Sequence, residues 1–196
     1  MARNRGRLAQ TGPRPPGARA TDAPPACGHE VLALSSRVRV ATSTSLQIRE
    51  RQSADDPFIG RLAARAFAEY DGQPALTMRR LTRRGTTWVA WRGDAPVGFA
   101  VVHPLDQFSV DLCALAVEED ARGLGIGRAL LAHVERTVVS AGLKEIRLHT
   151  AQSNLSALEL FLKSGFRLQE RLPRFYRGMY DACALFKIVG SRRAAK

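Results

Sequence analysis

The sequence has few cysteines, and their spacing excludes two kinds of small cross-linked domain. Only three of the 196 residues are cysteine, Cys27, Cys113 and Cys183, and no two of them form a Cys-x-x-Cys pair. A disulfide framework uses an even set of cysteines, and a structural zinc site uses closely spaced ligands. We therefore expect a protein of the reducing cytoplasm, without disulfides and without a bound metal.

Long apolar runs are also missing. No stretch approaches the roughly 18 apolar residues that a membrane span requires, and residues 1–45 lack the apolar core, about 7 to 15 residues long, of a secretory signal. They carry seven arginines, two acids and two Pro-Pro segments. This composition predicts a disordered basic tail and no membrane partner. A transit peptide, or a start site placed too far upstream, is the alternative.

Acidic residues are scarce, with 18 Asp and Glu against 30 Lys and Arg, so the net charge is +12. Such a surplus is typical of nucleic-acid-binding proteins. The ends of the chain carry most of it, however: +5 in residues 1–45 and +3 in 191–196, which leaves +4 for 46–190. We expect one domain over residues 46–190 between two basic tails, and we rank a nucleic-acid partner last.

From residue 46 onward, apolar periodicity and turn residues predict alternating strands and helices. The predicted strands are 46–49, 86–91, 97–102, 108–117, 145–150, 166–176 and 181–189, and the predicted helices are 55–67, 75–83, 126–142 and 154–165. In the last helix we expect Leu155, Leu158, Phe161 and Leu162 to face the core. This order has no internal repeat and predicts a mixed α/β domain.

A glycine-rich stretch, residues 120–131, lies between an apolar strand and a helix. Gly123, Gly125 and Gly127 leave their backbone amides uncovered, and the helix that follows directs unpaired N–H groups and the positive end of its dipole toward the same place. Arg122 adds a positive charge at the rim. The stretch predicts a seat for a diphosphate, with an ordinary loop as the alternative.

Two familiar phosphate-binding motifs do not match this stretch. A Walker A loop ends in Gly-Lys-Ser or Gly-Lys-Thr, whereas Gly127 is followed by Arg128 and Ala129. A Rossmann fingerprint has the spacing Gly-x-Gly-x-x-Gly within repeated βαβ units, and here the pattern is Gly-x-Gly-x-Gly after strands that we expect to be antiparallel. Both alternatives are therefore weak.

Two motifs together carry a resemblance to a known family. Arg-Gly-Leu-Gly-Ile-Gly at 122–127, after the apolar strand 115–117, resembles the Arg/Gln-x-x-Gly-x-Gly/Ala loop of the GNAT superfamily of acetyl-CoA-dependent N-acetyltransferases. Residues 154–166 are similar to that family's second motif, Asn-x-x-Ala-x-x-Leu-Tyr-x-x-x-Gly-Phe. The resemblance covers roughly residues 46–190, and the C-terminal half is most similar to the ribosomal-protein N-alpha-acetyltransferases.

The resemblance implies a GNAT fold, in which a splayed central sheet is flanked by helices, and acetyl-CoA as the acetyl-donor cosubstrate. The pantetheine arm would lie between the strands that end at Val117 and Thr150 and pair with the first of them. The amides of the glycine loop would hold the pyrophosphate. The cofactor-binding residues implied are Leu115, Ala116, Val117, Arg122, Gly123, Leu124, Gly125, Ile126, Gly127, Arg128, Asn154 and Phe161. For Asn154, a helix N-cap is a compatible alternative.

The catalytic base is less clearly marked. In the ribosomal-protein enzymes a Glu on the strand before the Asn acts as base, and His149 occupies that place here. An imidazole ordinarily titrates near pH 6.5 and so accepts a proton at neutral pH, directly or through water. We predict His149 as the base, with Asp111 and His103 as weaker alternatives. Cys113 as a covalent acyl carrier is weaker still.

The catalytic acid is in doubt because of Phe161. Relatives commonly carry a Tyr at this position, which protonates the coenzyme A thiolate, and phenylalanine has no hydroxyl. Either the thiolate leaves unaided, or another hydroxyl takes this role. We predict Tyr176, in the final pair of strands, as that catalytic residue, and Tyr180 is close by in the sequence.

Together these features predict a cytoplasmic N-acetyltransferase that transfers the acetyl group directly to a primary amine. The acceptor is a protein or peptide N-terminus or a small-molecule amine, and the enzyme is a monomer or a homodimer. The alternative is a catalytically degenerate GNAT domain that binds acyl-CoA as a sensor or interaction module. Phe161 and the missing Glu are the reasons for that alternative.

Overall fold

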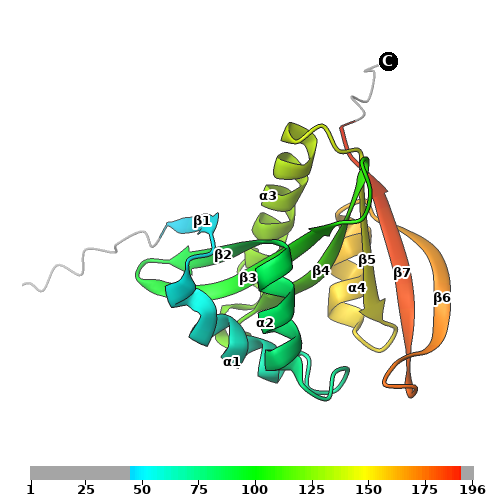
Figure 1. Ribbon diagram of the computed structural model, residues 1–196, viewed down its shortest axis with the longest axis horizontal. Coiled ribbons are helices and arrows are strands. Elements are labelled where there is room, and N and C mark those ends of the chain that lie inside the picture. The colour runs from blue at the N-terminus through cyan, green and yellow to red at the C-terminus, as the bar shows by residue number, and fades with distance from the viewer. Residues whose placement is uncertain (1–44, 191–196) are drawn as a thin grey trace, which may run out of the picture. The chain divides into compact units, whose positions relative to one another are not determined.

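The structure is a computed structural model that describes residues 45–190, and the predicted tails lie outside the described residues except for residue 45. In this part of the chain, seven strands form one mixed sheet in the order β1-β2-β3-β4-β5-β7-β6 (Figure 1). The strands are β1 Leu46–Glu50, β2 Thr86–Arg92, β3 Ala95–Pro104, β4 Ser109–Val117, β5 Glu145–Ala151, β6 Arg167–Tyr176 and β7 Tyr180–Ile188. The predicted element order and the mixed α/β class are confirmed.

Helices cover both faces of this sheet. Helices α1 Asp56–Ala66 and α2 Pro74–Arg84 share one buried cluster with Val89 of β2, and α3 Ile126–Ser140 and α4 Leu155–Lys163 share the other with Trp88. Adjacent residues of one strand thus enter opposite cores, as the two-residue period of a strand requires. No helix in the described part is both long and apolar enough to cross a membrane.

The sheet splits between β4 and β5. These two strands are parallel and pair only where Ser109–Asp111 lies beside Glu145–Arg147. Beyond that point β4 continues to Val117 without a partner on this side, while β5 pairs with β7 over its whole length (Figure 1). The predicted splay is therefore confirmed, and it opens toward the C-terminal ends of both strands.

A β-bulge lies just past this split. The pairing of β3 with β4 steps from Val101 opposite Ala114 to Val102 opposite Leu112, so Cys113 is an extra residue on β4. Leu112 belongs to the core under α3, whereas Ala114 belongs to the core under α1 and α2. Leu112 and Ala114 are two residues apart, so they would face the same side of a regular strand. The inserted residue between them explains why they face opposite sides. The sequence analysis did not anticipate this bulge.

The prediction for the buried face of α4 is wrong at two residues. Leu155 is 73% exposed and Leu162 is 51% exposed, whereas Phe161 is 6% exposed. The core side of α4 is formed by Ala157, Leu158 and Phe161. At about 100° per residue, Leu155 and Leu162 lie roughly 100° around the helix from the middle of that side.

A nearly buried ion pair joins β1 to the start of α1. The carboxylate of Asp55 is 2% exposed, and it accepts two hydrogen bonds of 2.8 Å from the guanidinium of Arg49 and one of 2.7 Å from the amide of Gln52. The neighbouring residue, Asp56, pairs with Arg51 at 2.6 Å, but its side chain is 47% exposed. The two adjacent acids therefore differ mainly in burial.

We predict that Asp55→Asn lowers the free energy of unfolding by about 2–3 kcal/mol, because it leaves the half-buried Arg49 guanidinium without its counter-charge. The matched substitution Asp56→Asn should cost about 0–1 kcal/mol, since water screens an exposed pair. Urea unfolding of both variants and the wild type measures the difference. Equal losses in the two variants would contradict the structural role given to Asp55.

Candidate active site

Two cavities adjoin at the splay. The first, of about 680 Å³, lies beside the glycine loop, and the second, of about 340 Å³, lies between the bulge of β4, the segment joining α1 to α2, and the β6–β7 hairpin. Leu115, Asn154 and Leu160 line both cavities. The site is therefore one groove with a loop end and a hairpin end.

At the loop end, the backbone conformation requires glycine. Gly123 and Gly125 have φ of 77° and 78°, a region that side chains other than glycine rarely adopt, and a Cβ on either would meet nothing within 4 Å. Gly125 is the N-cap of α3 and, within the described residues, no side chain caps this helix. The first amides of α3 are thus free and, with the helix dipole, form a site suited to an anion.

Most residues predicted for the pyrophosphate line this end of the groove. They are Arg122, Gly123, Gly125, Ile126, Gly127 and Arg128. Leu124 belongs to the same loop, but its side chain is 54% exposed and is not part of the lining. At Gly127 the reason for glycine is lack of space, because a Cβ there would lie 3.3 Å from Leu160 Cδ2. Helices α3 and α4 therefore approach closely at the loop.

The middle of the groove is formed by β4 and the start of α4. Leu115, Ala116 and Val117 line it from the side on which β4 no longer pairs with β5. Unpaired backbone of this kind can accept an extended ligand as an additional strand. Asn154 Oδ1 accepts hydrogen bonds from the Ala157 amide at 3.2 Å and from Ser156 Oγ at 3.1 Å. The N-cap alternative for Asn154 is thus confirmed, and its contact with a cofactor stays a prediction.

An aromatic cluster closes the hairpin end. Tyr70, from the segment between α1 and α2, packs against Tyr176 at 5.5 Å and Tyr180 at 5.7 Å between ring centroids. Phe175 contacts Tyr176 at 5.0 Å and stacks on His149 at 4.9 Å. The cluster therefore joins the two halves of the split sheet. Sequence reasoning missed Tyr70, whose one signal is an aromatic residue in the polar run Glu-Tyr-Asp-Gly.

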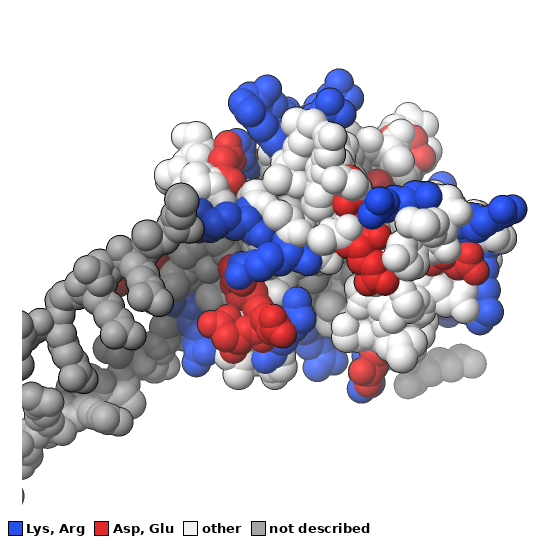
Figure 2. Space-filling view, turned by 90° about the horizontal axis from the view of Figure 1, so that it is seen from below, with Lys and Arg blue, Asp and Glu red and all other residues white. Residues whose placement is uncertain are grey.

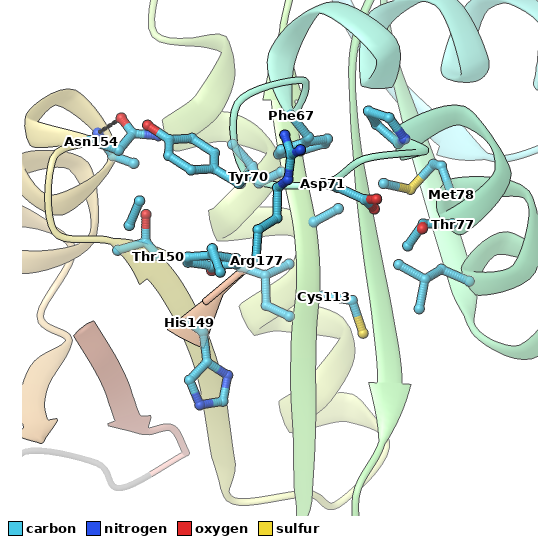
Figure 3. Close-up of a pocket in the computed structure, with 18 of the residues that line it drawn as sticks. Phe67, Tyr70, Asp71, Thr77, Met78, Cys113, His149, Thr150, Asn154 and Arg177 are labelled. Atoms are coloured by element: carbon cyan, nitrogen blue, oxygen red, sulfur yellow. Dashed lines mark hydrogen bonds between the residues drawn. The ribbon is translucent and has the colours of Figure 1, made fainter. Parts of the chain in front are cut away.

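The predicted base, His149, lies on the wall of the second cavity. Its side chain is exposed, and its ring is stacked on Phe175 at an interplanar angle of 16°. Figure 3 shows the imidazole pointing away from Thr150 and Asn154. The structure brings His149 to the groove but shows no hydrogen bond that fixes its ring among the described residues.

Tyr176 and Cys113 are both held in their protonated forms. Burial, and secondly the negative charge of Asp111, raises the pKa of Tyr176 to about 12. Burial and Asp111 likewise raise the pKa of Cys113 to about 12, and the thiol donates to Asp111 Oδ2 at 3.3 Å. A thiol in this state is a poor nucleophile at neutral pH. The structure therefore does not favour Cys113 as an acyl carrier.

The weaker alternative His103 has a structural position. Its Nε2–H donates to the carbonyl of Leu81 at 2.8 Å, near the end of α2, and a Cβ on Gly85 would lie 2.1 Å from its Cδ2. His103 is also not among the residues that line the two cavities. It holds α2 against β3 and is poorly placed to act as base.

Charge on the visible surface is mixed. Figure 2 shows Lys and Arg side chains interspersed with Asp and Glu on the face seen from below, rather than gathered into one basic patch. This face gives no support to a nucleic-acid surface, which requires clustered positive charge. Among the described residues, no group of three or more His, Cys, Asp or Glu is placed to hold a metal ion.

The chain is similar to proteins that are named as acetyltransferases. The chain is 31% identical over 156 residues to a mycothiol acetyltransferase of Geodermatophilus obscurus, covering 70% of this chain and 49% of that protein. The ribosomal-protein-S18-alanine N-acetyltransferase of Escherichia coli superposes with a TM-score of 0.66 at 21% identity, covering 78% of this chain and 99% of that one. A GNAT family acetyltransferase from Elizabethkingia anophelis, with acetyl-CoA bound, superposes with a TM-score of 0.64 at 20% identity, covering 74% of this chain and 98% of that one.

The two structural likenesses, at these identities, show the fold alone, a mixed α/β fold that these acetyltransferases share. Residues 49–166 match the model of the acetyltransferase (GNAT) family, so the chain belongs to that family. The resemblance found from the two motifs is confirmed. The chain spans about half the length of the curated relatives it matches, 49% in the case of the Geodermatophilus protein.

We predict that iodoacetamide alkylates Cys113 slowly at pH 8, because a pKa of about 12 leaves roughly one thiol in ten thousand ionised. Asp111→Asn removes a negative charge that raises this pKa, so it should speed the reaction by roughly tenfold. Peptide mass spectrometry follows the reaction, with the buried Cys183 as an unreactive control in both proteins. Wild-type Cys113 reacting at the rate of a free cysteine would contradict the assignment.

Proposed function

We propose that the chain is an acetyl-CoA-dependent N-acetyltransferase that transfers an acetyl group directly to a primary amine. The observation that carries this proposal is the split between β4 and β5, which leaves residues 112–117 without a strand partner on the β5 side, between an anion-binding loop and an aromatic hairpin. One continuous groove thus offers a diphosphate seat at one end and an acceptor cavity at the other. Direct transfer requires both substrates side by side.

In the proposed complex, coenzyme A lies along the larger cavity. The free amides at the start of α3, with Arg122 and Arg128, face its pyrophosphate, and Leu115–Val117 face its pantetheine arm. Phe161 is 6% exposed, contacts Phe166 edge-on at 5.6 Å between centroids, and lines the smaller cavity. It therefore bounds the thioester end with an apolar ring.

The acceptor amine must lose a proton to attack the thioester carbonyl. We assign to His149 the role of the base that accepts this proton through an ordered water, because His149 lies on the wall of the acceptor cavity. The half-buried carboxylate of Asp111 lines neither cavity, but its charge acts on Tyr176, which does line the acceptor cavity, so Asp111 is the second candidate. The backbone at Cys113 departs from the regular ladder, and we assign to its amide the stabilisation of the oxyanion.

The elevated pKa of Tyr176 limits its role. A phenol with a pKa of about 12 is a weaker acid than a thiol, whose pKa is ordinarily about 8.5. Full transfer of its proton to the coenzyme A thiolate is therefore uphill. We assign to Tyr176 a hydrogen bond to the departing sulfur, which stabilises the developing charge without proton transfer. This role compensates in part for the absence of a hydroxyl at Phe161.

The acceptor we propose is a protein or peptide N-terminal amine or a small-molecule amine. Tyr70 and Tyr176 line the cavity and can contact either kind of acceptor, and Tyr180 supports Tyr70 through a ring contact. Relatives and fold neighbours are named for acceptors of both kinds. A single domain over residues 46–190, a cytoplasmic location and a monomeric or homodimeric state remain parts of the proposal.

A catalytically degenerate acyl-CoA sensor is the other function that Phe161 and the missing Glu raise. The relatives do not favour it, because those reported above are named as acetyltransferases. The groove also has an acceptor end with its own titratable groups, which a sensor of acyl-CoA alone does not need. We therefore keep the sensor only as an outcome of the following test.

We predict that the purified chain releases free thiol from acetyl-CoA when a suitable primary amine is supplied. We would test a panel of small amines and of peptides beginning with Ala or Ser. A thiol reagent measures the free thiol, and mass spectrometry measures the acetylated product. Reactions without amine and without protein correct for hydrolysis. Tight coenzyme binding with no turnover across the panel would favour the sensor instead.

We predict that His149→Ala lowers kcat by roughly 100-fold and removes the acidic limb of the pH profile of kcat/KM, because a general base contributes a factor of this order. Tyr176→Phe should lower kcat by roughly 10 to 100-fold and keep that limb, since it removes only a hydrogen bond to a charged group. Coenzyme affinity, measured by calorimetry, should change little in either variant. A wild-type pH profile in His149→Ala would move the assignment to Asp111.

A further inference from the structure

Arg177 stands at the tip of the β6–β7 hairpin in a conformation that does not suit its side chain. The Met179 amide donates to the Tyr176 carbonyl at 3.0 Å, and the two residues inside this turn, Arg177 and Gly178, have φ of 53° and 68°. At the first such position, Asn, Asp or Gly is preferred, because the left-handed region is strained for other residues. The turn itself therefore gives no reason for an arginine.

The side chain of Arg177 belongs to the acceptor cavity. Arg177 lines the cavity of about 340 Å³, and Figure 3 shows its side chain running toward the segment that carries Phe67, Tyr70 and Asp71. Its guanidinium forms no ion pair with any acid of residues 45–190. Among residues 45–190 it is the only arginine that lines this cavity, so a positive charge without an ion pair in this part of the chain faces the acceptor.

Asp71, the one carboxylate of the described residues that lines the same cavity, forms no ion pair with Arg177. Asp71 Oδ1 accepts the amide of Gln73 at 2.8 Å, just before α2 begins, and so has a local structural partner. The hairpin tip is also held in place, because Tyr70 packs against both Tyr176 and Tyr180. Arg177 is thus presented from a supported turn and stays available to a ligand.

We propose that the acceptor carries a carboxylate close to its primary amine, and that Arg177 binds this carboxylate. The planar guanidinium is suited to a carboxylate through two parallel hydrogen bonds. The inference rests on the proposed acetyl transfer, and it narrows the acceptor to an anionic amine. The carboxylate has two possible sources, an acidic side chain near a peptide N-terminus or the carboxylate of a small amino acid.

The test compares acceptors of nearly the same shape, one member of each pair carrying the carboxylate and the other its amide. Peptides with amidated C-termini that begin Ser-Asp or Ser-Asn form one arm, and free amino acids against their carboxamides form the other. In the wild type, kcat/KM should favour the carboxylate member by about tenfold or more in one arm, since the contact is a charge-assisted hydrogen bond. The arm that shows the preference identifies the source. Equal rates in both arms, or a preference for the neutral member, would overturn the proposal.

Arg177→Asn is the informative variant. It removes the charge but places a residue that tolerates positive φ, so its thermal midpoint should equal or exceed that of the wild type while the charge preference falls to about one. Arg174→Asn is the matched control, because Arg174 is on the same hairpin, has φ of 52° and does not line the cavity. It should keep the preference. An undiminished preference in Arg177→Asn, or equal loss in both variants, would refute a specific contact.

A binding measurement separates this inference from the proposed function. Calorimetry with the N-acetylated forms of the same acceptors, added to the full chain with excess coenzyme A, does not depend on turnover. If the wild type binds the carboxylate member more tightly and Arg177→Asn abolishes this preference, the role of Arg177 is supported. If no thiol is released in the same preparation, only the proposed acetyl transfer is contradicted. The absence of a charge preference in binding, or of any binding, would overturn the role of Arg177.

Discussion

The early end of the pairing between β4 and β5 is the constraint on which the site depends. Three residue pairs hold these strands together, after which each continues with a free side. Backbone groups left without a ladder partner need water or a ligand. The cost of this gap is offset elsewhere: β5 pairs fully with β7, and the aromatic contacts of Tyr70 with Tyr176 and Tyr180 join the two halves across the opening.

The same opening sets the electrostatics of the acceptor end. Asp111 lies where β4 and β5 still pair, directly before the bulge, and its charge reaches both Cys113 and Tyr176. In a partly buried site a carboxylate keeps neighbouring acids protonated, because a second negative charge there is unfavourable. Cys113 is thus unreactive and Tyr176 is a hydrogen-bond donor. Burial first, and this one carboxylate second, thus keep both groups protonated.

The sequence predicted the element order, the splay and the glycine loop, because each has a local signal or a motif. Gly123 and Gly125 require positive φ, and Asn154 caps a helix, whatever the rest of the chain does. The bulge at Cys113 has no such signal, since it depends on how β4 pairs with β3. The prediction that Leu155 faces the core failed for a related reason: the sequence of a short apolar helix does not reveal which of its sides meets the sheet.

The two ends of the groove differ in how they are encoded. The glycine loop at one end is a single continuous segment, residues 122–128, so in the proposed complex a change there acts directly on the coenzyme. The acceptor end is assembled from Tyr70, His149 and the turn at Arg177, which are far apart in the sequence and meet only through packing. Surface turns tolerate substitution better than core elements. In the proposed enzyme, acceptor preference can therefore change at Arg177 without disturbing the fold or the glycine loop, so motifs that identify the family do not identify the acceptor.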